Sequence, residues 1–167
     1  MPPELIPLDE ITEETFEKFS RAQAVSIINT PFIFLNNLRV VLLAGVLSIF
    51  SFGVLVLLLF LINGTVVSFL LAQVIQAGYN PVLFLVAFIL PHGIFEIPAL
   101  VIGFAFAFRI GASLISPPDG LDVGQALLLT SANFVKILVL VVIPLLFVGA
   151  FVEANITPNI VIWLYAG

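Results

Sequence analysis

Long uninterrupted apolar runs constrain this chain more than any other feature. The run from Val40 to Ile62 has no charged side chain. At about 23 residues and about 1.5 Å per residue, such a helix crosses roughly 30 Å of hydrocarbon. The whole chain of 167 residues is 62% hydrophobic and 9% charged, with a mean hydropathy of +1.29, whereas soluble domains carry about 25% charged residues. The chain is therefore predicted to fold in a lipid bilayer.

Acidic side chains gather near the N-terminus, and we divide the chain into an acidic segment, residues 1–30, and a transmembrane helical domain, residues 31–167. Asp9 is expected to cap a helix in the first segment. Its apolar residues share one face, as in an amphipathic helix at the membrane surface: Ile11, Phe19, Ala22 and Val25. With a net charge of −5, nucleic acid is not an expected partner. The absence of cysteine excludes disulfides and thiolate chemistry.

The first helix of the domain is expected to begin with Thr30 as its N-cap and Pro31 in its first turn. Asn63-Gly64 is a turn signal that is expected to end the first span. The next two apolar segments, residues 65–77 and 81–90, are short for a complete crossing. They are therefore predicted to be tilted or partly inserted helices.

Pro91 is predicted to break the helix that contains it, because proline has no N–H and its ring obstructs the preceding turn. Gly93 then allows a new start. Two spanning helices, the second with a kink at Pro144, and one short interfacial helix are expected after the break, over residues 94–115, 131–152 and 153–167. The predicted fold is an all-α polytopic membrane protein with about five membrane-inserted helices, some short or broken.

The few basic residues predict the orientation. Lys18, Arg21 and Arg39 precede the first span, and Arg109 and Lys136 flank the polar connection at residues 116–125. Because basic residues favour the cytoplasmic side, both places and the N-terminus are predicted to be cytoplasmic, in a multi-pass protein of the cell membrane. Three polar residues would then lie at the inner face: Asn36, Asn37 and Arg39. The two asparagines are expected to cap helices, to bond across helices or to face headgroups.

The stretch "LPHGIFEIPA" holds the only histidine, His92, and places Glu96 one helical turn after it. An ionised glutamate inside a membrane costs about 2.5 kcal/mol or more, so it needs a partner, a proton or water. The predicted topology brings Glu153 to the same membrane face. Imidazole and two carboxylates suit zinc or a similar divalent cation, the only cofactor the sequence suggests. The alternatives are a structural bridge between helices, a proton site and a chance interfacial pair.

The face that carries His92 and Glu96 continues through a ladder of small residues: Ala99, Gly103, Ala107 and Gly111. Small residues at every fourth position allow membrane helices to approach closely. This ladder is predicted to be a helix-packing face. Catalytic motifs are not found, because one histidine excludes a His-Glu-x-x-His helix and no nucleophile or phosphate-loop motif is present. The chain is not expected to be an enzyme.

Four stretches resemble the stage II sporulation protein M family of integral membrane proteins, in the order of that family: "FLNNLRV", "LINGTVVSFLL", "ILPHGIFEIPALVIG" and "GAFVEANITP". The third is the most specific. The resemblance implies a multi-helix membrane protein, and in spore-forming bacteria a non-enzymatic member of an engulfment complex that holds peptidoglycan-remodelling enzymes. The titratable positions that match are His92, Glu96 and Glu153, and the motifs also contain Pro91, Gly93, Pro98, Asn63 and Gly64.

Two classes of function follow from these observations. The first is a membrane scaffold or interaction protein, expected to form a homodimer through small-residue helix faces and to organise membrane or cell-envelope proteins. The alternative is a transporter or channel-like protein, with a cation or proton site at the interrupted helix around Pro91.

Overall fold

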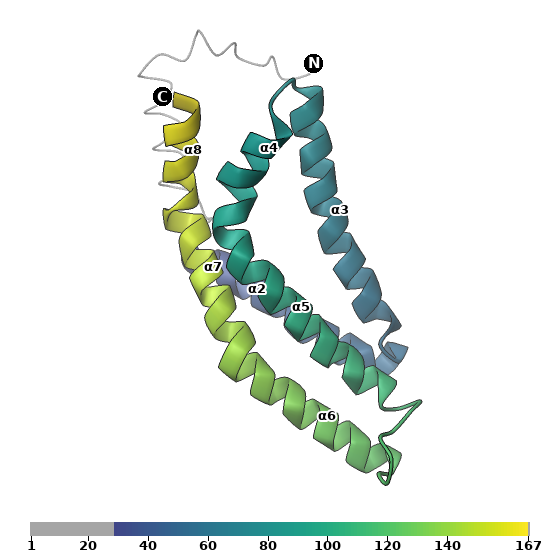
Figure 1. Ribbon diagram of the computed structural model, residues 1–167. Coiled ribbons are helices and arrows are strands. Elements are labelled where there is room, and N and C mark those ends of the chain that lie inside the picture. The colour runs from purple at the N-terminus through teal and green to yellow at the C-terminus, as the bar shows by residue number, and fades with distance from the viewer. Residues whose placement is uncertain (1–28, 167) are drawn as a thin grey trace.

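The computed structural model describes residues 29–166, all of whose regular elements are helices (Figure 1). The amphipathic helix expected in residues 1–30 falls almost wholly outside these residues. The elements are α2 (Thr30–Ser51), α3 (Val54–Gln76), α4 (Pro81–Phe84), the π-helical segment η2 (Leu85–Ile89), α5 (Leu90–Ala112), α6 (Val123–Ile137), the π-helical segment η3 (Leu138–Val142), α7 (Ile143–Asn155) and α8 (Thr157–Ala166). They confirm the predicted all-helical membrane fold.

The described chain contains four helices long and apolar enough to cross a membrane, where the sequence predicts about five membrane-inserted helices. They are residues 30–51, 54–76, 81–112 and 123–163. The predicted span at 40–62 is wrong, because the chain turns within it at Phe52-Gly53. Both residues adopt left-handed backbone conformations, with φ of 52° and 89°. Ser51 and Gly53 flank Phe52, and the Ser51 hydroxyl accepts the N–H of Leu55 at the start of α3. Serine and glycine are also common inside membrane helices, so hydropathy alone does not reveal the turn.

The turn predicted at Asn63-Gly64 is also wrong, because α3 runs through both residues. The side-chain amide of Asn63 donates to the carbonyl of Leu59, 2.8 Å away and one turn back in the same helix. This bond satisfies a polar group at membrane depth without any neighbour. As a result, α3 is one continuous helix, long and apolar enough to cross a membrane, over the residues predicted to form a turn and a short inserted segment.

The helix break predicted at Pro91 is replaced by a change of helix type. The N–H of Leu90 bonds to the carbonyl of Leu85, five residues back, and closes the π-helical segment η2 just before the proline. Ile143 bonds to Leu138 in the same way in η3, just before Pro144. A wider turn removes the clash between each proline ring and the carbonyl four residues earlier. Both helices therefore stay continuous, and α4 meets α5 at a bend rather than a gap (Figure 1).

The start of α2 and of α6 is fixed by side-chain caps. The Asn29 side chain, rather than the predicted Thr30, accepts the N–H of Phe32 at 3.0 Å. At α6, Asp122 accepts the N–H of Gln125 at 2.8 Å, while the Gln125 side chain accepts the N–H of Asp122 at 3.2 Å. This capping box ends the polar connection after α5.

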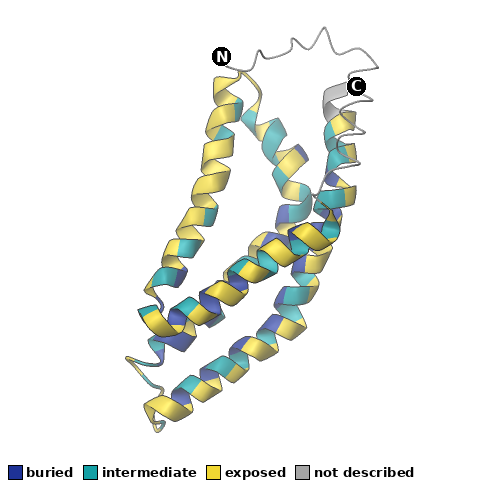
Figure 2. Cartoon of the chain, turned by 180° about the vertical axis from the view of Figure 1, so that it is seen from behind, coloured by how far each residue is buried: buried dark blue, intermediate teal, exposed yellow. Residues whose placement is uncertain are grey.

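The core lies where α2, α5 and the α6–α7 helix pack together, and it includes the fully buried Val41, Val142 and Leu146. Ser48 links two of these helices, because its hydroxyl donates to the carbonyl of Ala107 and accepts the N–H of Gly111 at 2.8 Å. Of α3, only Val56 is buried. Figure 2 shows this helix exposed along almost its whole length. The described residues thus form a three-helix core and one spanning helix that packs only lightly against it.

The directions of the helices place the first half of α2, with Arg39, and the last turn of α5, with Arg109, toward opposite membrane faces, although both basic residues are predicted at the same face. Ser48, near the end of α2, contacts Gly111, near the end of α5, so these helices run in parallel. The connection at residues 113–122 therefore lies at the opposite membrane face from the start of α2. The reason is that α3 is itself long and apolar enough to span the membrane, which adds a crossing between α2 and α5. A cytoplasmic N-terminus stays a prediction, without the support of these residues.

Candidate functional site

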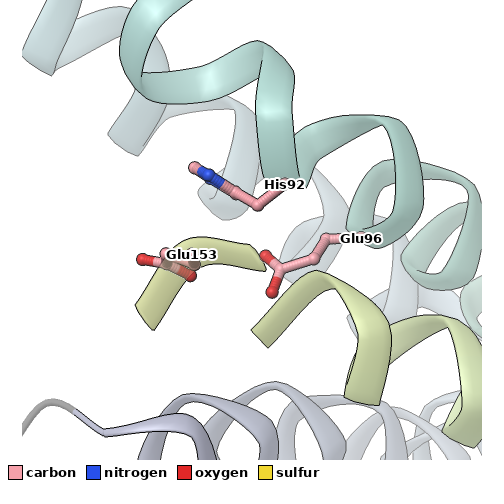
Figure 3. Close-up of side chains that lie close together, drawn as sticks. All are labelled: His92, Glu96 and Glu153. Atoms are coloured by element: carbon pink, nitrogen blue, oxygen red, sulfur yellow. The ribbon is translucent and has the colours of Figure 1, made fainter. Parts of the chain in front are cut away.

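His92 and Glu96 occupy one face of α5 in its first two turns, directly after the bend at η2. Their separation of four residues places both side chains on the side that faces α7 (Figure 3). Glu96 is only 8% exposed. The wide turn of η2 allows the helix to stay regular around Pro91 and so holds the two side chains one turn apart.

Glu153 reaches the same place from α7, and Gly149 makes the approach possible. A methyl group at Gly149 would overlap the Cγ atom of Glu96, so only glycine leaves room for the Glu96 side chain to cross α7. Glu153 lies one turn after Gly149, on the same face of α7. The two helices therefore bring together the ligand pair on α5 and a third ligand beside a glycine on α7.

The three side chains line a cavity of about 320 Å³, together with Phe32, Ile33, Asn36 and Asn37 of α2. One donor atom from each of His92, Glu96 and Glu153 lies within 4.8 Å of the other two. Within the described residues, buried Nδ1 of His92 and buried Oε1 of Glu96 have no hydrogen-bond partner. Buried polar atoms are rarely left without a partner, so this arrangement is suited to a ligand with positive charge or hydrogen-bond donors.

Two residues of the cavity, Asn36 and Asn37, lie at the same membrane face as His92, contrary to the prediction. They are expected at the face opposite His92, but α2 starts beside the bend and puts them in the same cavity. Arg39, assigned to the same polar group, is exposed and does not line the cavity. The incorrect placement of the asparagines relative to His92 and the incorrect grouping of the basic residues have the same cause, namely that the prediction did not include α3 as a separate span.

The predicted small-residue ladder is used inside the chain. Ala99, Gly103, Ala107 and Gly111 are all buried. A methyl group at Gly103 would press on Val41, and one at Gly111 would overlap the backbone of the α2–α3 turn. The ladder thus packs α5 against α2 and leaves no surface there for a second copy.

The remaining motif residues have structural positions. Pro91 lies in the first turn of α5, Gly93 is buried one residue after His92, and Pro98 lies inside α5 and contributes to an apolar surface groove. Asn63 and Gly64 lie in α3, a helix that contributes no residue to the cavity lining. Sequence reasoning missed Ser48 and Gly149. Only the position of Gly149, one turn before Glu153, is a signal that points to it.

Comparison with known proteins agrees with the motifs. A family model described as Stage II sporulation protein M matches residues 8–158. The chain is also similar to an uncharacterized protein of Methanocaldococcus jannaschii, with 34% identity over 140 residues that cover 81% of this chain and 75% of the relative. No solved structure matches the chain.

Proposed function

Because the chain belongs to the stage II sporulation protein M family of multi-pass membrane proteins, we propose that it is a non-enzymatic scaffold that organises other membrane or cell-envelope proteins. The observation that supports this function is the exposure of α3. This helix is long enough to span the membrane, yet it contributes only one buried residue, Val56, to its own chain. A spanning helix that contributes so little to its own core is available to bind another protein.

One face of α3 has the chemistry for close helix contact. Gly64, Ser68 and Ala72 follow one another at intervals of four residues, and all three are exposed. A methyl group at Gly64 would meet no atom within 4 Å. Small residues in this spacing let two helix backbones approach closely in lipid, where van der Waals packing drives association. We name Gly64, Ser68 and Ala72 the α3 ladder.

The proposed occupant of the α3 ladder is α3 of a second copy of the chain. The ladder on α5 is buried inside the chain, so it no longer provides the face for the expected homodimer. The α3 ladder offers the same spacing on an open surface. A dimer built this way leaves the three-helix cores of both copies on the outside, where partner proteins bind.

The test is self-association in lipid bilayers, measured by energy transfer between labelled copies at decreasing protein-to-lipid ratio. The double variant Gly64→Leu, Ser68→Leu is expected to abolish the transfer, because the side chains separate the backbones. Val66→Phe is the matched control, because Val66 is exposed on the opposite side of α3 and its enlargement leaves the ladder intact. A monomeric wild type, or equal transfer in the double variant, contradicts the proposal.

The transporter or channel-like alternative stays a prediction. The sequence feature behind it is the helix break expected at Pro91, as in transporters whose unwound backbone binds the substrate. Because the chain stays helical through Pro91, that motivation no longer applies.

A further inference from the structure

We propose that His92, Glu96 and Glu153 bind one divalent cation of the zinc type between α5 and α7. This inference does not rest on the scaffold function, since the donors lie on other helices than the α3 ladder. It requires that the charge, the geometry and the surroundings of the three side chains suit such an ion.

Charge is the first argument. Two carboxylates approach each other inside an apolar helix bundle, and no lysine or arginine of the described residues lines their cavity. A divalent cation neutralises both carboxylates, and the neutral imidazole of His92 adds a ligand without adding charge. A bound ion of this charge therefore turns a repulsive cluster into a neutral site, which is the form that a low-dielectric environment favours.

Geometry is the second argument. Zinc binds histidine nitrogen and carboxylate oxygen at about 2.0–2.2 Å, which separates the ligands of a tetrahedral site by roughly 3.4 Å. The three donors lie within 4.8 Å of one another, so rotations of the side chains bring them to that spacing. Asn36 and Asn37 line the same cavity and supply a carbonyl oxygen or hold a water for the fourth position.

Two buried polar atoms of the cluster without partners are the third argument. Glu96 is more than nine-tenths buried, with an exposed fraction of 8%. Its Oε1 atom and the Nδ1 atom of His92 have no hydrogen-bond partner among the described residues. A structural bridge between His92 and Glu96 would use these atoms on each other. The unpaired atoms point to a ligand between them instead.

Gly149 shows that the neighbouring helix is shaped for this cluster. Its missing side chain leaves the space through which Glu96 passes toward Glu153. Alanine at this position would keep all three donors and displace one of them. A site that depends on Gly149 is therefore distinguishable from nonspecific binding by carboxylates.

The experiment is a titration of the full-length protein, purified in detergent and stripped with a chelator, with Zn²⁺ alone. Elemental analysis after gel filtration gives the stoichiometry, and calorimetry gives the affinity. Wild type is expected to bind one equivalent. His92→Ala, Glu96→Gln and Glu153→Gln are each expected to weaken binding by more than about 100-fold, since loss of even an outer-shell partner costs about 10–100-fold.

Two further variants separate coordination from folding. Gly149→Ala is expected to weaken Zn²⁺ binding about 10-fold with the donors intact, whereas Asp119→Asn, in the connection after α5, leaves it unchanged. Co²⁺ in the wild-type site is expected to give the absorption bands of a low-symmetry nitrogen and oxygen site, and these bands are lost in Glu96→Gln. Absence of a stoichiometric ion in wild type, or equal binding by the three ligand variants, overturns the proposal.

Discussion

Gly111→Ala tests how closely α5 approaches the α2–α3 turn. A Cβ atom at this position would overlap the backbone of Gly53, Ser48 and Phe52. Backbone atoms at a tight turn cannot move aside as a flexible side chain does. The new methyl group therefore has to push the end of α5 away from α2.

The expected destabilisation is about 3 kcal/mol. Overpacking of this kind costs about 3 kcal/mol, the upper end of the usual range, because backbone is the obstacle. Displacement also weakens the bond from the N–H of Gly111 to Ser48, at 2.8 Å, which contributes about 1 kcal/mol. The helix propensity of alanine offsets about 1 kcal/mol of the total.

The assay is reversible unfolding in mixed micelles by titration with sodium dodecyl sulfate, followed by circular dichroism at low protein concentration. Gly64→Ala is the matched control, because it makes the same change in a helix where a methyl group meets nothing within 4 Å. It is expected to be neutral or to stabilise by up to about 1 kcal/mol. Equal stabilities for the two variants would refute the close approach of α5 to the turn.

Two further substitutions probe single hydrogen-bonding groups by the same unfolding assay. Ser48→Ala removes the hydroxyl that joins α2 to Ala107 and Gly111, so the free energy of unfolding is expected to fall by about 1–3 kcal/mol. The control is Ser68→Ala, because the Ser68 hydroxyl bonds only within its own helix. Its loss of stability should be less than about 0.5 kcal/mol. Asp122→Ala removes half of the capping box of α6 and should lower stability by about 1 kcal/mol, whereas an unchanged stability would show that the cap is not formed in micelles.

The amino-acid sequence predicts the class of fold well and the placement of turns poorly. Apolar composition alone identifies a helical membrane protein, because no other solvent suits such a surface. The positions of turns are harder to predict. Asn63 satisfies its amide inside α3, whereas the turn at Phe52 has only Ser51 and Gly53 beside it, two residue types that are also common inside membrane helices. A helix in lipid tolerates residues that end helices in water, so rules learned from soluble proteins misplace the boundary.

The three titratable residues of the candidate site were predictable from the sequence, but the residues around them were not. Spacing on one helix brings His92 and Glu96 together, and Glu153 was the remaining acidic group expected at that depth. The structure does place these three side chains around one cavity. Asn37 and Gly149 depend on which helices are neighbours, and that information comes from the number of crossings rather than from local pattern. One uncounted helix was enough to misplace the asparagines.

The π-helical segments η2 and η3 also decide where this chain tolerates a change in length. Each contains one residue beyond what an α-helical turn requires. Deletion of one residue there therefore leaves the faces of the flanking helices in the same relative orientation, although the proline loses its wide turn. A deletion between His92 and Ala112 instead rotates the residues on one side of it by about 100° relative to the other. Insertions and deletions among homologous chains should accordingly collect at these two segments, while the interval from His92 to the end of α5 keeps its length.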